Sequence, residues 1–161
     1  MTLKLSETLG HALQLKGYTI TVAESCTGGS IASAITESAG SSQWFSAGVV
    51  TYSDATKQSL LNVSADTLKK YGAVSEDVVK EMLVGVLALS EASIGIAVSG
   101  VAGPTGGSPH KPVGTVCIAW GDSSVQHSNT YLFPGDRSEV RRAATRQSLH
   151  LASRFLKDQK S

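Results

Sequence analysis

A hydroxyl and a thiol stand side by side in the segment 23–29, which reads AESCTGG. Ser25 and Cys26 directly follow a β-branched run at 19–22 and precede apolar residues with helical spacing at 31–35. Where a strand gives way to a helix, backbone N–H groups without an intrahelical acceptor can face a bound group. Glycines let that group approach the backbone closely. The segment therefore predicts a site that holds an anion or aims a nucleophile at a substrate.

Ser25 is the candidate nucleophile, and Lys57 and Tyr52 are the candidate groups that assist it. Lys57 lies in a short helix predicted after the strand at 47–52, and a lysine acts as a base when burial favours its neutral amine. Tyr52, between that strand and helix, could relay a proton or orient Lys57. The residues alone leave purely structural roles open: Ser25 as a helix cap, Lys57 as a solvated surface residue and Tyr52 as a residue at the edge of the core.

Cys26 is a second candidate nucleophile. A thiol at the start of a helix can have a lowered pKa, whereas a small buried cysteine is inert. Adjacent side chains at the end of a strand point to opposite sides. We therefore expect only one of the two to face a substrate, and we favour Ser25.

These residues lie on loops, and a sheet must bring the loops together. Strands alternate with helices up to residue 99, which predicts an α/β fold with a mostly parallel sheet covered on both faces and an antiparallel hairpin at one edge. Ligands of such sheets bind at the carboxyl ends of the strands. The predicted strands are 18–24, 47–52, 94–99, 113–120 and 125–133, and the predicted helices include 6–16 with Ser6 as its cap, 27–38, one capped by Ser53, one starting at Ser75, and 137–157.

Composition narrows the class of protein. The 161 residues predict a single domain, 1–161, and the net charge of +1 gives no reason to expect nucleic acid as a partner. An apolar run long enough to span a membrane is absent from the sequence. Two distant cysteines and four scattered histidines indicate a reduced, cytoplasmic protein without a zinc site.

Five segments of the chain stand out: AESCTGG (23–29), TYSDATK (51–57), GAVSE (72–76), GVAGPTGGSPHKPVG (100–114) and GDRSEVRR (135–142). Together they closely resemble motifs of the CinA C-terminal domain family, also described as the nicotinamide-nucleotide amidase family, and the resemblance runs from about residue 6 to 155. The chain resembles the stand-alone form of that family.

The resemblance implies an amidohydrolase that converts nicotinamide mononucleotide to nicotinic acid mononucleotide and ammonia, in pyridine nucleotide salvage. It implies a three-layer α/β/α sandwich, a homodimer, and no cofactor or obligatory metal. Ser25, Tyr52 and Lys57 match the positions assigned to catalysis. Two alternatives stay open: an inactive nucleotide-binding paralogue with a regulatory role, and an interaction protein related to competence or DNA damage.

The substrate that the resemblance implies carries a phosphate, so donors near Ser25 are candidate binding groups. Hydroxyls and N–H groups at 27–30 form one set, and a second lies at 103–107. Arg141 is our choice among three arginines that also include Arg137 and Arg142, because a guanidinium matches phosphate geometry. Family members often carry Asp where Thr105 stands. The candidate binding residues are Glu24, through a ribose hydroxyl or the loop backbone, with Thr27, Gly28, Gly29, Ser30, Gly103, Thr105, Gly106 and Arg141.

Overall fold

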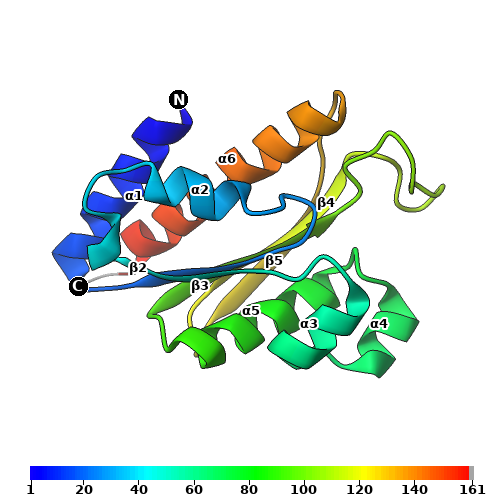
Figure 1. The fold of residues 1–161 in the computed structure, drawn as a ribbon, viewed down its shortest axis with the longest axis horizontal. Helices are drawn as coiled ribbons and strands as arrows, with labels where there is room; N and C mark the ends of the chain where they lie inside the picture. The colour runs from blue at the N-terminus through cyan, green and yellow to red at the C-terminus, as the bar shows by residue number, and fades with distance from the viewer. Residues whose placement is uncertain (160–161) are drawn as a thin grey trace.

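One five-stranded sheet, with strand order β2-β1-β3-β4-β5, runs through the middle of the computed structural model, which describes residues 1–159 (Figure 1). The first three strands in this order pair in parallel, and β4 and β5 continue the sheet antiparallel. The predicted parallel centre with an antiparallel edge hairpin is therefore confirmed. The strands are β1 (Ile20–Glu24), β2 (Phe45–Val50), β3 (Ile94–Gly100), β4 (Thr115–Gly121) and β5 (Gln126–Leu132).

Helices cover both faces of the sheet, which confirms the three-layer α/β/α sandwich (Figure 1). One face carries α1 (Thr2–Lys16), α2 (Ser30–Thr36) and α6 (Arg137–Asp158). The other carries α3 (Asp54–Leu61), α4 (Ala65–Tyr71) and α5 (Glu76–Ser90), and a short 3-10 helix, η1 (Ser41–Gln43), precedes β2. Within residues 1–159 no helix is both long and apolar enough to cross a bilayer.

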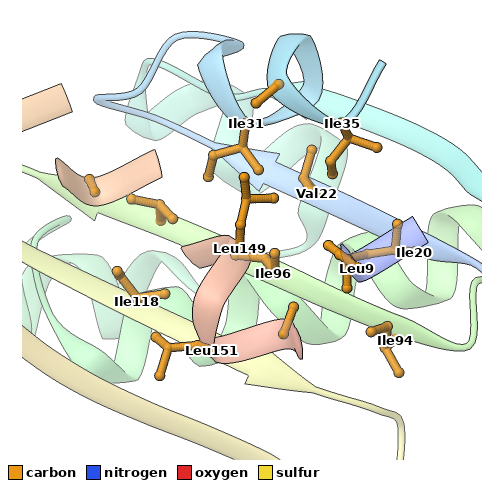
Figure 2. Close-up of a cluster of buried hydrophobic side chains, with 14 of the residues drawn as sticks. Leu9, Ile20, Val22, Ile31, Ile35, Ile94, Ile96, Ile118, Leu149 and Leu151 are labelled. Atoms are coloured by element: carbon orange, nitrogen blue, oxygen red, sulfur yellow. The ribbon is translucent and has the colours of Figure 1, made fainter. Parts of the chain in front are cut away.

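The two faces of the sheet are packed differently. Large side chains such as Val22, Ile96 and Ile118 meet α1, α2 and α6, and Figure 2 shows several of them gathered around Leu149. The opposite face carries small residues, among them Ala97, and packs against α5. Because successive strand residues point to opposite faces, this alternation of large and small residues lets α5 lie close to the sheet.

Serines begin several of the helices. The side chain of Ser53 accepts the N–H of Thr56 at the start of α3, and Ser75 caps α5 in the same way, as predicted. The predicted cap Ser6 is wrong: α1 begins at Thr2, and Ser6 is buried inside it, where its hydroxyl donates to Ile35 O at 3.4 Å. The first turn of α1 has no acidic residue and no capping side chain, so the sequence carries no signal for a helix start at Thr2.

The helix predicted to begin at residue 27 begins instead at Ser30. Residues 25–29 form a turn in which Gly28 and Gly29 have φ angles of 59° and 97°. A positive φ at two consecutive residues cannot continue a right-handed helix. The segment AESCTGG is therefore a strand end followed by a tight turn, and its polar groups belong to the turn.

Gly85 sets the position of α3, the helix that carries Lys57. A Cβ atom at Gly85 would lie 2.0 Å from the carbonyl oxygen of Leu61, so only glycine lets the end of α3 rest on α5. Leu61 is itself buried against Met82 and its neighbours. The backbone contact between α3 and α5 thus fixes the helix from which Lys57 reaches the sheet edge.

We expect Gly85→Ala to lower the free energy of unfolding by roughly 1–3 kcal/mol, the scale of an overpacked core. In an unobstructed helix interior the same change stabilises by about 0.5–1 kcal/mol, so the sign reports the contact. Urea denaturation gives the free energy. Val84→Ala, at an exposed position of the same helix, serves as the control, and a stabilised Gly85→Ala variant would contradict the close approach.

Candidate active site

Ser25 and Lys57 meet at the carboxyl edge of the sheet. The Nζ atom of Lys57 lies 3.1 Å from Oγ of Ser25 and donates to the carbonyl oxygen of Thr51 at 2.8 Å. Ser25 directly follows β1, and Thr51 follows β2, the neighbouring strand. The N–H of Thr51 donates to Glu24 O at 2.9 Å, so the ends of both strands are tied together. The structure therefore brings the predicted hydroxyl and amine into hydrogen-bond contact.

The amine of Lys57 is withdrawn from water: only 1% of the residue is exposed. Burial lowers the pKa of Lys57 from its ordinary value of 10.5, because desolvation penalises the charged form; the nearby carboxylate of Asp54 opposes this effect. A neutral amine keeps one lone pair, which can accept the Ser25 proton while an N–H still donates to Thr51 O. The pair thus has the geometry of a nucleophile and its general base.

Tyr52 directly follows Thr51 in the chain, and Arg137 holds its hydroxyl. Tyr52 is 59% exposed, and its hydroxyl accepts a hydrogen bond from Nη2 of Arg137 at 2.9 Å. The other terminal nitrogen of Arg137 donates to Gly103 O at 2.7 Å. The guanidinium thereby joins the loop after β2 to the loop after β3. The sequence made Arg137 a candidate only for binding phosphate. Its role as a bridge between the two loops could not be predicted from any motif.

Glu24 uses its carboxylate on the turn itself. The residue is fully buried and accepts N–H groups of Gly29 at 3.1 Å, Ile31 at 3.1 Å and Ala32 at 2.8 Å. Of the two roles considered for Glu24, the hydrogen bonds to the loop backbone are the ones present here. The carboxylate occupies the first N–H groups of α2, which an external anion would otherwise meet.

Arg141 holds the same turn from the opposite direction. Its Nε donates to Cys26 O at 3.2 Å, and its Nη2 donates to Thr27 O at 2.9 Å and lies 3.3 Å from Oγ of Ser30. The hydroxyl of Ser30 also donates to Thr27 O at 2.6 Å. Most of the polar atoms proposed for substrate binding on this turn are therefore engaged with one another.

Cys26 has the properties of an inert thiol. The side chain is buried, and desolvation raises its pKa to about 12, so the thiolate is scarce near neutral pH. Ser25 retains a little exposure, 8%, and has the amine beside it. Of the two candidate nucleophiles, the serine is the one with a base in contact.

The loop 101–114 projects beyond the end of the sheet (Figure 1), and Thr105 and Gly106 on it are exposed. The ammonium of Lys111 donates to Tyr71 O at the end of α4 and so ties the loop to the opposite helix layer. Near the start of the loop, the carbonyl oxygen of Gly103 accepts the hydrogen bond from Arg137. The two sets of candidate binding residues thus come from separate loops at one edge of the sheet.

A hollow of about 450 Å³ lies beside the turn. Its walls include Gly28, Gly29, Ser30, Arg141 and Arg142, with further hydroxyls on α2 and α6. Within residues 1–159, no three His, Cys, Asp or Glu side chains gather in a way that could hold a metal ion. Glu37 also lines the hollow, and the exposed Arg142 is its cation best placed to meet an anionic group, because Arg141 already donates to backbone carbonyls.

Two contacts of the site came from backbone atoms that a sequence does not reveal. Thr51 O receives the Lys57 amine, and Val98 O accepts the N–H of Ser25 at 3.0 Å. A carbonyl is common to every residue type, so neither role leaves a pattern in the sequence. Only the pairing of β1 with β2 and β3 places these oxygens.

The fold and site together define an α/β protein with a serine–lysine pair at the carboxyl ends of the parallel strands of a mixed sheet. A sequence model described as the CinA C-terminal domain matches residues 2–156, and the chain belongs to that family.

Relatives of known name cover nearly the whole chain. A protein of Enterobacter agglomerans named nicotinamide-nucleotide amidohydrolase PncC is 52% identical over 96% of each chain, and its namesake in Escherichia coli K12 is 47% identical over 97% of this chain and 96% of its own. The solved structure of competence damage-inducible protein A from Klebsiella pneumoniae has a TM-score of 0.96 and 42% identity, with 99% of each chain covered.

The lowered pKa of Lys57 makes a prediction about stability. Between the folded-state pKa and 10.5 the unfolded chain binds more protons than the folded protein, so the free energy of unfolding should rise with pH in that window. We expect Lys57→Met to remove this rise, measured by urea denaturation at several pH values from 7 to 10. Lys80→Met, at an exposed position on α5, should keep the wild-type slope. Equal slopes in all three proteins would contradict a depressed pKa.

Proposed function

We propose that the protein is an amidohydrolase that converts nicotinamide mononucleotide to nicotinic acid mononucleotide and ammonia, as a step of pyridine nucleotide salvage. The observation that carries the proposal is the 3.1 Å contact between Ser25 Oγ and the buried amine of Lys57. The names of the relatives from Enterobacter agglomerans and Escherichia coli supply the substrate. An amide is a poor electrophile, so its hydrolysis needs an activated nucleophile of this kind.

In the first half of the reaction, neutral Lys57 takes the hydroxyl proton as Ser25 Oγ attacks the carboxamide carbon. A C–O bond forms, and the π electron pair of the carbonyl moves to its oxygen. When the tetrahedral intermediate collapses, the C–N bond breaks and the nitrogen leaves as ammonia with the proton from Lys57. The contact between the amine and Thr51 O holds Nζ beside Oγ through both proton transfers.

In the second half, the ester on Ser25 is hydrolysed. Lys57, neutral again, takes a proton from a water molecule that attacks the ester carbon. The C–O bond to Ser25 breaks, the serine oxygen recovers the proton from Lys57, and the carboxylic acid leaves and releases its proton to water. The same pair therefore serves as base and acid in turn.

The phosphate of the nucleotide needs cationic partners, and the hollow beside the turn offers two. Arg141 is largely engaged with backbone carbonyls, whereas Arg142 is exposed and lines the same hollow. We assign the phosphate contact mainly to Arg142, with hydroxyls of the hollow as further donors. Thr105 and Gly106 on the projecting loop complete the proposed binding surface.

Tyr52 is assigned to the catalytic set by its position in the family motif. Its hydroxyl is held by Arg137 and the residue is 59% exposed, so we assign it to contact with the substrate rather than with the serine–lysine pair. We also propose that the enzyme is a homodimer and that it is located in the cytoplasm. The two free, buried cysteines support a reducing compartment.

We expect purified protein to release ammonia from nicotinamide mononucleotide and Ser25→Ala to stop the release, because within residues 1–159 no other hydroxyl contacts the Lys57 amine. Ammonia is measured with a coupled assay, and nicotinic acid mononucleotide by chromatography. Ser42→Ala, an exposed serine in η1, is the matched control and should keep wild-type turnover. Tight binding of the nucleotide without turnover would favour a non-catalytic binding protein instead.

Lys57 should control the pH dependence of that turnover. We expect kcat/KM to rise with pH through an acid limb whose midpoint lies below 10.5, because the amine must be neutral to accept the serine proton. Lys57→Ala should lower kcat by at least ~100-fold, the usual scale for loss of a general base. Steady-state kinetics from pH 6 to 10 test both points. A change in KM alone would assign Lys57 to binding.

A further inference from the structure

A second hollow, of about 790 Å³, adjoins the one beside the turn. The two hollows share Thr2 and Arg142 in their walls, so they meet between α1 and α6, which pack against each other on one face of the sheet (Figure 1). Residues 25–30, which form the turn and the start of α2, are absent from the walls of the second hollow. A mononucleotide that reacts at Ser25 and places its phosphate at Arg142 therefore leaves the second hollow unfilled.

Two arginines of α6 line the second hollow. Arg142 and Arg146 are exposed and one helical turn apart, so their side chains leave the same side of the helix. Within residues 1–159, the guanidinium of Arg146 donates to Sδ of Met1 at 3.7 Å, and a thioether is a weak acceptor. Most of its N–H groups are thus available to a ligand. A pyrophosphate suits this pair of arginines, because each of its two phosphates can accept hydrogen bonds from one guanidinium.

The negative charge in the second hollow is already used within the protein. Among residues 1–159, Glu139 is the acidic residue in its wall, and its carboxylate accepts the N–H of Asp136 at 2.7 Å as part of the cap of α6. The two arginines outnumber this single carboxylate. The second hollow therefore carries a net positive charge at neutral pH, which favours an anionic ligand.

An aromatic ring lines another part of the second hollow. Phe133, which follows β5, stacks on Tyr131 with the ring centroids 5.6 Å apart and the ring planes at 8°. Gln147 and His150 of α6 line the same hollow. A nucleobase binds by stacking on aromatic rings, and amide and imidazole groups can hydrogen-bond its edge. The chemistry of this wall therefore suits a nucleoside next to the anionic group.

We propose that the two hollows together bind a dinucleotide, in which the phosphate of a pyridine mononucleotide is joined through a pyrophosphate bridge to a second nucleoside. This inference rests on the proposed function, because the position of the first phosphate at Arg142 is taken from it. The mononucleotide half occupies the hollow beside the turn, the second phosphate contacts Arg146, and the second base stacks on Phe133. The dinucleotide and the mononucleotide then exclude each other, so the dinucleotide slows hydrolysis of the mononucleotide by competition.

Steady-state kinetics with oxidised nicotinamide adenine dinucleotide as the inhibitor test the inference. Nicotinic acid mononucleotide is measured by chromatography, so ammonia from the dinucleotide itself does not disturb the result. We expect a raised apparent KM at constant kcat. Arg146→Met should raise the inhibition constant about tenfold, the scale for loss of a hydrogen bond to a charged group, and change KM for the mononucleotide less than about twofold. Arg154→Met, at an exposed position of α6 outside both hollows, is the matched control and should leave both constants unchanged.

Phe133→Leu tests the stacking contact by itself. Phe133 packs against the core, and leucine keeps an apolar side chain there, so we expect the variant to fold. The inhibition constant for the dinucleotide should rise at least ~5-fold, the scale for loss of base–aromatic stacking, while KM for the mononucleotide changes little. An equal change in both constants would show that Phe133 only supports the structure.

Adenosine monophosphate, as a second inhibitor, separates the two halves of the ligand. It carries the second base and one phosphate but no pyridine ring, so it reaches only part of the proposed surface. We expect its inhibition constant to exceed that of the dinucleotide at least ~10-fold. Equal inhibition by the two compounds would overturn the inference, because the two hollows would then not act together.

The remaining outcomes separate the inference from the proposed function. Absent or non-competitive inhibition, or inhibition unchanged in both Arg146→Met and Phe133→Leu, would overturn the inference and leave the proposed function standing. If wild-type protein forms no nicotinic acid mononucleotide, titration calorimetry with the dinucleotide replaces the kinetics. Binding that weakens in Arg146→Met would then overturn the proposed function alone, and absence of binding would overturn both.

Discussion

The site depends on one energetically unfavourable feature, the burial of the Lys57 amine away from water. A buried ammonium is stabilised only by groups that the protein supplies, and here these are a backbone carbonyl and a serine hydroxyl. Because burial removes the amine from water, the charged form is less stable and the pKa of Lys57 is lowered. The position of the Lys57 amine and its proton affinity therefore come from the same burial, and the contact of α3 with Gly85 maintains this burial.

The turn after β1 is organised by backbone chemistry rather than by side chains that reach a ligand. Glu24 neutralises one set of N–H groups, and Arg141 takes up the carbonyls. These two charged residues would be expensive to bury alone, and each is compensated by several hydrogen bonds to the turn. Such a framework keeps the atoms around Ser25 in one arrangement, so little rearrangement is needed as a reaction proceeds.

Much of the architecture was predictable because it follows from local rules. Alternating strands and helices gave the layered sheet, and the serine caps at Ser53 and Ser75 gave two helix starts. The errors have local causes as well. The sequence predicts a cap at Ser6 because a serine there precedes apolar residues with helical spacing, and it predicts an early start for α2 because the positive φ angles of the two glycines in the turn are not visible in the sequence.

The sequence by itself determined the order of elements, the loops that carry chemistry, and the family motifs with Ser25, Tyr52 and Lys57. Local propensity and hydrophobic period are written in residue types, so they can be read along the chain. The tertiary structure alone decided which polar atoms meet. It paired Lys57 with Ser25, turned Arg141 and Glu24 toward the turn, and sent Arg137 across to Tyr52. These contacts join residues far apart in sequence through strand pairing and backbone carbonyls, which every residue type possesses alike.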